Sequence, residues 1–153
     1  MPAHIAPVSF TGAIYAISDD LPATYDAAGY SDVGVVFTDL AQVESFPEFG
    51  LEQALNEFNP INGPTTYIKG AEKYGQGPIT LADIPADAGQ VIAKAASESS
   101  AHYSVRATYT DGEVHYLDVL VAGWRLQSAS EGAVMKRMAN IGICRKPVVV
   151  EAT

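Results

Sequence analysis

Residues 85–119, "PADAGQVIAKAASESSAHYSVRATYTDGEVHYLDV", pass directly from a helical pattern into a β-hairpin pattern, and this change decides the expected fold. Pro85 suits the first turn of a helix, and Asp87 suits the positive end of the helix dipole. The apolar residues that follow recur at three-to-four spacing: Ala88, Val91, Ile92, Ala95 and Ala96. The pattern predicts a helix over about residues 85–98. Because three of its five apolar residues are alanine, we expect it to cover a sheet rather than to centre a core.

The hairpin signal is Asp111-Gly112, a pair typical of two-residue type I′ turns. It predicts that Thr110 lies opposite Glu113. In that register one face is apolar except for Asp118 and contains Tyr103, Val105, Ala107, Tyr109, Val114, Tyr116, Asp118, Leu120, Ala122, Trp124 and Leu126. The other face is mixed and includes Leu117, Val119 and Val121. Because this second face is partly apolar, we expect the helix or another subunit to cover it.

The rest of the chain favours strands and loops. Strands are predicted at residues 13–17, 33–46, 78–83 and 134–146, with the last apolar run, "PVVVEA", as an edge strand or tail. Residues 47–77 are rich in glycine and proline and predict a long projecting hairpin or loop. Together these patterns predict one domain over residues 1–153, a mainly β sandwich or barrel with one flanking helix.

Composition narrows the class of protein. The 153 residues carry a formal net charge of −9, and residues 1–68 contain nine carboxylates and no Lys or Arg. An acidic surface predicts weak binding to duplex DNA, which is held by cations. The single cysteine rules out an intrachain disulfide framework and favours a reducing compartment. No apolar run approaches the ~20 residues that span a bilayer, so we expect a soluble, untargeted protein.

The sequence shows no catalytic, cofactor or metal motif. The residues considered for such sites were His4, His102, His115, Cys144, Asp19, Asp20 and the "GQG" at 75–77. The histidines lack metal-ligand spacing, Cys144 fits a small buried thiol, and the glycines fit a turn. Asp19 and Asp20 fit a solvated loop. We therefore expect no enzymatic activity, no cofactor and no metal.

Six short stretches occur in an order that resembles the tail tube proteins (major tail proteins) of long, non-contractile-tailed bacteriophages. They are "LPATYDAAGY" at 21–30, "EFG" at 48–50, "NPING" at 59–63, "IKG" at 68–70, "YGQGPITLADIPADAGQ" at 74–90 and "TDGEVHYLDVLVAGW" at 110–124. The resemblance implies a β-sandwich flanked by one helix and hexameric rings that stack into a conduit for DNA. It also implies contacts with the tape measure, tail terminator and tail tip proteins, a place in the virion tail, and assembly in the host cytoplasm.

The resemblance implies self-assembly and therefore contacts between subunits. Two groups stand out beside the apolar run Leu117, Val119 and Val121: the loop residues Phe49, Leu51, Leu55, Phe58 and Ile61, and the cations Lys136, Arg137, Arg145 and Lys146. We expect the loop to order when rings stack and the cations to meet the acidic residues 1–68 of a neighbouring subunit.

Other roles on a similar scaffold stay open. A tail terminator, or the tube of a gene transfer agent or secretion-like system, would share the fold. A small-ligand-binding β-barrel would use Asp118 as a polar group in an apolar pocket. An adhesion or decoration module would bind a capsid or glycan without assembling with itself.

Overall fold

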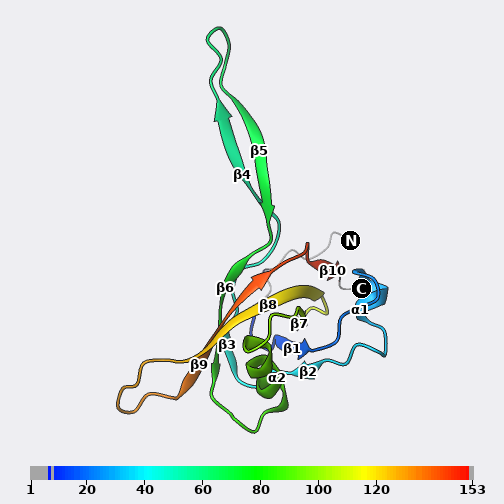
Figure 1. Cartoon of the computed structure of the whole chain (residues 1–153), viewed down its shortest axis with the longest axis vertical. Coiled ribbons are helices and arrows are strands. Elements are labelled where there is room, and N and C mark those ends of the chain that lie inside the picture. Colours follow the sequence, from blue (N-terminus) through cyan, green and yellow to red (C-terminus); the bar gives the residue numbers. More distant parts are fainter. Residues whose placement is uncertain (1–6, 8, 152–153) are drawn as a thin grey trace.

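The computed structural model describes residue 7 and residues 9–151, and it consists mainly of antiparallel strands (Figure 1). The strands are β1 Ile14–Ser18, β2 Thr38–Asp39, β3 Val43–Ser45, β4 Glu52–Phe58, β5 Thr66–Lys73, β6 Gln76–Ala82, β7 Tyr103–Thr108, β8 Val114–Leu126, β9 Lys136–Ile143 and β10 Val148–Val150. The helices are α1 Ala27–Tyr30 and α2 Ala88–Ser97. The predicted class, a β-sandwich with a flanking helix, is confirmed.

One eight-stranded sheet forms the body of the molecule. Its order is β2-β1-β7-β8-β9-β6-β3, and β10 pairs with one end of β8 beside β9. The sheet curves around a core of aliphatic side chains from five strands, from α2 and from the residue after β2: Ile17, Leu40, Ile79, Leu81, Ala93, Ala96, Val105, Leu117, Val119, Val121, Ala139, Ile141 and Ile143. Burying such side chains stabilises each by about 1.5–3 kcal/mol, which makes this core the main source of stability.

The β7–β8 hairpin exists, but its predicted register is wrong by one residue. The turn contains three residues, because the amide of Tyr109 donates to the carbonyl of Glu113 at 3.0 Å. Gly112 supplies the positive φ, 95°, that ends such a three-residue loop. A slip of one residue exchanges the two faces of a strand. As far as Ala122, β8 therefore presents Leu117, Val119 and Val121 to the core. The register shifts again between Ala122 and Arg125, and Trp124 packs against the core as well.

In the observed register, one group of predicted subunit contacts, Leu117, Val119 and Val121, lies in the interior of the chain. Val105 lies opposite Leu117, and Tyr103 lies opposite Val119. Leu117 and Val119 are 0% exposed and Val121 is 6% exposed. The proposal that these three residues form a subunit contact is wrong, because they are already covered within their own chain.

Helix α2 flanks the sheet as predicted, although it is rotated relative to the predicted stripe. Its buried residues are Gly89, Gln90, Ala93 and Ala96, whereas Val91 is 55% exposed. Gly89 permits close packing, since an added Cβ would lie 2.3 Å from the carbonyl oxygen of Asp39. The buried amide of Gln90 donates to the carbonyl of Ala82 at 2.8 Å and accepts from the amide of Ile84 at 3.0 Å. Close backbone contact and a satisfied polar side chain therefore determine the buried face.

Residues 19–37 cover the second face of the sheet. The sequence predicted a single strand over residues 33–46, which overlap the end of this segment. This segment contains α1 and packs by aromatic contacts: Tyr30 stacks on Tyr116 at 5.0 Å, and the guanidinium of Arg106 lies 4.9 Å from the ring of Phe37. Only the short β2 and β3 form within 33–46. Intramolecular coverage explains why this face is buried in a single chain.

Strands β4 and β5 form a separate two-stranded sheet that stands clear of the body (Figure 1). We call residues 51–74 the arm and the remainder of the described chain the body. The projecting element predicted at 47–77 is thus a paired hairpin. Its base is fixed, because Gly50 donates to the carbonyl of Tyr74 at 2.8 Å. Gly75 has φ 128°, and an added Cβ would lie 2.5 Å from the carbonyl oxygen of Glu48, so this position requires glycine.

Candidate assembly surfaces

The buried carboxylate of Asp118 belongs to a structural cluster. It is 1% exposed and lies 3.1 Å from Nδ1 of His102 and 3.2 Å from Nε of Arg145. The guanidinium of Arg145 also lies 3.8 Å from the ring centroid of Tyr25. These contacts join β8, the residue before β7 and the chain after β9 to residues 19–37, which cover this face of the sheet. Asp118 is almost fully buried and its carboxylate is held by these partners, which argues against a role as a ligand-binding group.

The other residues considered for chemistry have ordinary structural surroundings. Asp20 accepts from the amide of Val36 at 3.2 Å and so stabilises a loop. His115 pairs with Glu113, while His4 lies outside the described residues. Within the described chain, no group of three or more acidic, histidine or cysteine side chains is arranged to hold a metal ion. Over the same residues, none of the helices combines the length and the apolar character needed to span a membrane.

The thiol of Cys144 is exposed, which corrects the prediction of a buried side chain. Partial burial and the nearby carboxylate of Asp118 raise the pKa of this thiol. Because the thiolate is the nucleophilic form, a raised pKa lowers its reactivity at neutral pH. The surroundings of Cys144 therefore lack the features that activate a catalytic cysteine.

The arm carries several exposed apolar side chains close together in the chain. In β4 only Gln53, and in β5 only Gly70, is partly buried, and the other residues are exposed. Four of the five predicted loop contacts lie exposed on or beside it: Leu51 51%, Leu55 66%, Phe58 57% and Ile61 106%. Tyr67 and Ile68, 63% and 62% exposed, were not among the predicted contacts. They are consecutive in β5 and therefore lie on opposite faces of the hairpin, so both of its faces carry exposed apolar side chains. A two-stranded hairpin alone is marginally stable in water, so this surface favours a partner.

Phe49, the fifth predicted contact, belongs to a different surface at the base of the arm. Its ring makes edge contacts with Phe46 at 5.8 Å and with His115 at 5.3 Å. Phe46 in turn stacks on Tyr15 at 4.4 Å, and Tyr109 contacts His115 at 5.2 Å. We call the hollow lined by these five rings the aromatic groove.

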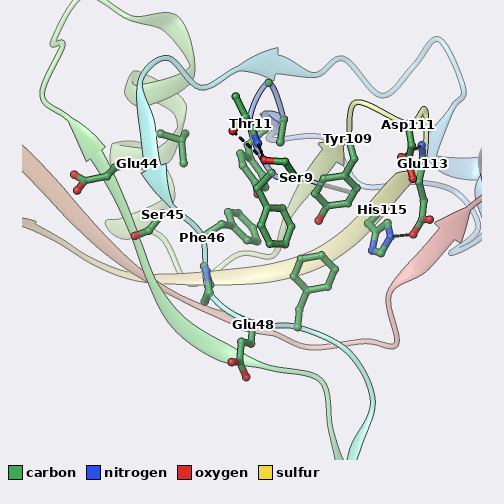
Figure 2. Close-up of a pocket in the computed structure, with 17 residues that line it drawn as sticks. Ser9, Thr11, Glu44, Ser45, Phe46, Glu48, Tyr109, Asp111, Glu113 and His115 are labelled. Carbon is green, nitrogen blue, oxygen red and sulfur yellow. Dashed lines mark hydrogen bonds and ion pairs between the residues drawn. The ribbon is translucent and has the colours of Figure 1, made fainter. Parts of the chain in front are cut away.

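The aromatic groove is wide, half-open and acidic at its margin. Its volume is about 1140 Å³, and it lies between the segment before β1, residues 43–49 and the β7–β8 turn. Figure 2 shows Glu44 and Glu48 on one side of the rings and Asp111 and Glu113 on the other. No Lys or Arg occurs among the described residues that line it. The sequence stretch "VESFPEF" at 43–49 supplies much of this groove, but its aromatic rings meet those of β1 and β8 only in the folded chain.

Three of the four predicted contact cations have partners within the chain. Lys136 pairs with Glu44 at 2.6 Å, Arg137 with Asp83 at 3.4 Å and Arg145 with Asp118. Lys146 is exposed and has no ion pair among the described residues. The Lys136–Glu44 pair does join the basic stretch to the acidic segment 1–68, but within a single molecule.

Comparison with known proteins gives likeness in fold without likeness in sequence. The chain matches no family model, and a search of curated proteins found no match. A chain in the cryo-EM structure of the anti-feeding prophage baseplate, six-fold symmetrised, superposes with a TM-score of 0.63 at 11% identity, covering 100% of this chain and 99% of that one. A chain in the tube-terminating cap of the same prophage gives 0.63 at 8% identity, with coverages of 99% and 96%.

A third solved structure extends the comparison. A chain in the extended sheath-tube complex of PVC, an extracellular contractile injection system, gives a TM-score of 0.61 at 8% identity, with coverages of 96% and 93%. Because the identities lie at 8–11%, these superpositions establish the fold of this chain and leave its role to be argued from its surfaces.

Proposed function

We propose that this chain is a structural subunit of a phage-type tail, which assembles with itself into six-membered rings that stack into a tube. The observation that carries the proposal is the full-length likeness to components of six-fold baseplate and sheath-tube assemblies. The exposed apolar arm supports it, since an isolated hairpin gains stability from a partner. Such a subunit needs one contact to close a ring and a second, open-ended contact to stack rings. Neither contact requires a catalytic residue.

Within a tail, the proposed tube would enclose DNA and a tape measure protein, and would end on terminator and tip proteins. The acidic net charge of −9 suits a wall past which DNA slides without adhering. The likeness to components of contractile injection systems leaves the kind of tail, contractile or non-contractile, as part of the proposal.

A tube terminator is the second candidate, because a chain of a tube-terminating cap superposes as well as the others do. The two roles differ in how assembly stops. A tube subunit continues to stack as its concentration rises, whereas a terminator forms single rings.

Negative-stain electron microscopy of the purified protein over a series of concentrations tests both roles. We expect rings about 90–100 Å wide, a width that the family resemblance implies, followed by stacks that lengthen with concentration. Single rings at every concentration would favour the terminator. A protein that stays monomeric at high concentration, even with a tail initiator present, would contradict the proposal.

A further inference from the structure

The last strand of the chain and residues 19–37 lie next to each other over the second face of the sheet, where β10 contacts α1 (Figure 1). We call residues 144–150 the strap and residues 19–37 the cover. We propose that Arg145 couples the strap to the cover, so that the two segments leave the sheet as one unit and not separately. This inference concerns the single chain and goes beyond the proposed function, because it does not depend on assembly.

The strap is attached to the sheet at two places. The amide of Cys144 donates to the carbonyl of Asp118 at 2.8 Å. Further along, β10 pairs with residues 114–116 of β8, but it has only three residues, so this pairing alone is a weak attachment. Arg145 lies between the two attachments. Its side chain therefore contributes most where the strap would otherwise be weakly held.

The cover is attached to the sheet by a hydrogen bond and to the strap by an aromatic contact. Ser104 of β7 is fully buried, and its hydroxyl donates to the carbonyl of Asp20 in the cover at 2.9 Å. The ring of Tyr25 in the cover lies 3.8 Å, centroid to carbon, from the guanidinium of Arg145. One guanidinium thus contacts the cover through Tyr25 and the sheet through Asp118.

The buried carboxylate of Asp118 makes the two attachments depend on each other. It is 1% exposed, and it lies directly opposite Ser104, to which the cover is attached. If the strap left alone, Asp118 would lose Arg145 and keep only His102 as a partner, while the cover stayed in place. A buried carboxylate that loses a charged partner without gaining full hydration is unfavourable. Full hydration requires the cover to move, so release of the strap favours release of the cover.

The coupling also acts from the cover to the strap. Lifting the cover removes Tyr25 from the guanidinium and admits water between Arg145 and Asp118, which weakens their attraction. The strap is then held mainly by the short pairing of β10. In the closed state, the strap occupies the edge of β8 at residues 114–116, and an unoccupied strand edge is able to pair with another chain.

Hydrogen exchange of the free subunit tests the coupling. In Arg145→Ala, we expect the amides of the strap and of the cover to exchange roughly tenfold or more faster, by similar factors, because both segments lose the shared guanidinium. Amides of β6, two strands away from β8, should keep their rates. The matched control is Lys146→Ala, because Lys146 is exposed and has no ion pair among the described residues. It should leave both segments unchanged.

A second pair of variants tests the buried charge as the cause. Asp118→Asn keeps the shape of the side chain but leaves no charge to be buried without a partner. In this background the strap should open more often than the cover, and adding Arg145→Ala should change the cover little. Arg145→Lys keeps a cation but loses the planar group that stacks on Tyr25. It should speed exchange less, with the same ratio between the two segments, and it serves as the test if Arg145→Ala does not fold.

The possible results separate the coupling from its alternatives. Faster exchange in the strap with no change in the cover would overturn it, and so would an equal effect of Lys146→Ala. A uniform rise that includes β6 would place both segments in the global unfolding unit and would also overturn it. Additive effects of Arg145→Ala and Asp118→Asn would show that the buried charge is not the cause. None of these results bears on the proposed tube, which is tested by ring formation.

Discussion

The body and the arm of this chain are both antiparallel sheets, but their surroundings are opposite. In the body, β8 alternates across a core, and Leu117 and Val119 are 0% exposed. In the arm, Leu55 and Phe58 lie in β4 and are 66% and 57% exposed. Leucine therefore stabilises the fold in one region and stays exposed in the other. Apolar residues of the body thus hold the fold together, whereas those of the arm stay exposed in the single chain, where the proposed subunit contacts would use them.

Hydrogen exchange gives the largest expected contrast between the two regions. In the free subunit, we expect amides of the arm, residues 51–74, to exchange about a thousandfold or more faster than those of β7 and β8, because the arm is marginally stable alone and the body opens only on unfolding. In tubes, the arm amides should become slow. Mass spectrometry of both states measures this, and equal protection of the arm in the two states would show that stacking uses another surface.

Matched leucine substitutions separate the regions by stability. Leu117→Ala should lower the free energy of unfolding by about 2–5 kcal/mol, because it removes buried contacts and leaves a cavity. Leu55→Ala removes the same atoms from an exposed side chain and should change stability by no more than about 0.5 kcal/mol. Urea denaturation of the monomer measures both values. A loss at Leu55 as large as that at Leu117 would mean that the arm is part of the folding unit.

The charge cluster of the body should have a smaller effect than its core. Asp118→Asn keeps the shape but removes the charge that faces His102 and Arg145, and we expect a loss of about 1–3 kcal/mol. The value stays modest because Arg145 is 54% exposed, so water can solvate its guanidinium. Glu131→Gln, on an exposed loop, should show no comparable loss in the same denaturation assay.

Alkaline pH should weaken the body through its tyrosines. Burial raises the pKa of Tyr15, Tyr30 and Tyr109 above the usual value of 10.0, and Asp118 adds to the effect at Tyr30. In the unfolded chain these groups ionise near pH 10, so the stability they contribute is present below that pH and is lost as pH rises through the folded pKa. Melting temperatures of the monomer should therefore fall above about pH 10. Tyr30→Phe should reduce that fall, and an unchanged profile would contradict this cause.

The smallest effect is expected at the basic stretch. Lys136 and Arg137 each pair within the chain and are 29% and 28% exposed, so changing both to Glu should cost the monomer only about 0–1 kcal/mol per pair. We also propose that these cations assist assembly, in which case the double variant should stack less readily at low salt. Light scattering against salt concentration measures this, and unchanged assembly at low salt would remove the role.

Residues at turns and helix ends predicted where the helices and strands occur, but they did not predict which face of each is buried. Pro85 and Asp87 indicated the start of a helix, and Asp87 does cap α2 by accepting from the amide of Gln90. Asp111-Gly112 indicated a turn, but a two-residue and a three-residue turn share that pair, and the choice decides which side of β8 is buried. Which face of β8 packs against the core therefore depends on the length of this turn, and the sequence does not specify that length.

Of the candidate assembly surfaces, the arm could be predicted from the sequence and the aromatic groove could not. Exposed apolar residues in a hairpin rich in glycine and proline could be predicted, because nothing nearby in the sequence could cover Leu55, Phe58 or Ile61. The aromatic groove could not, since Tyr15, Phe46 and Tyr109 are far apart in the chain and converge only through sheet pairing. The buried role of Asp118 was missed for a similar reason: Arg145 reaches it from another strand.

The short connection between β5 and β6 affects how the subunit would carry a mechanical load. Only Tyr74 and Gly75 separate the two strands, so the arm continues into a strand that pairs with β9 at seven positions. Interstrand hydrogen bonds run perpendicular to the strands, so tension along β5 would shear many of them together instead of peeling them one by one. If neighbouring subunits hold the arm, stretching or bending the assembly would load each sheet in its most resistant direction.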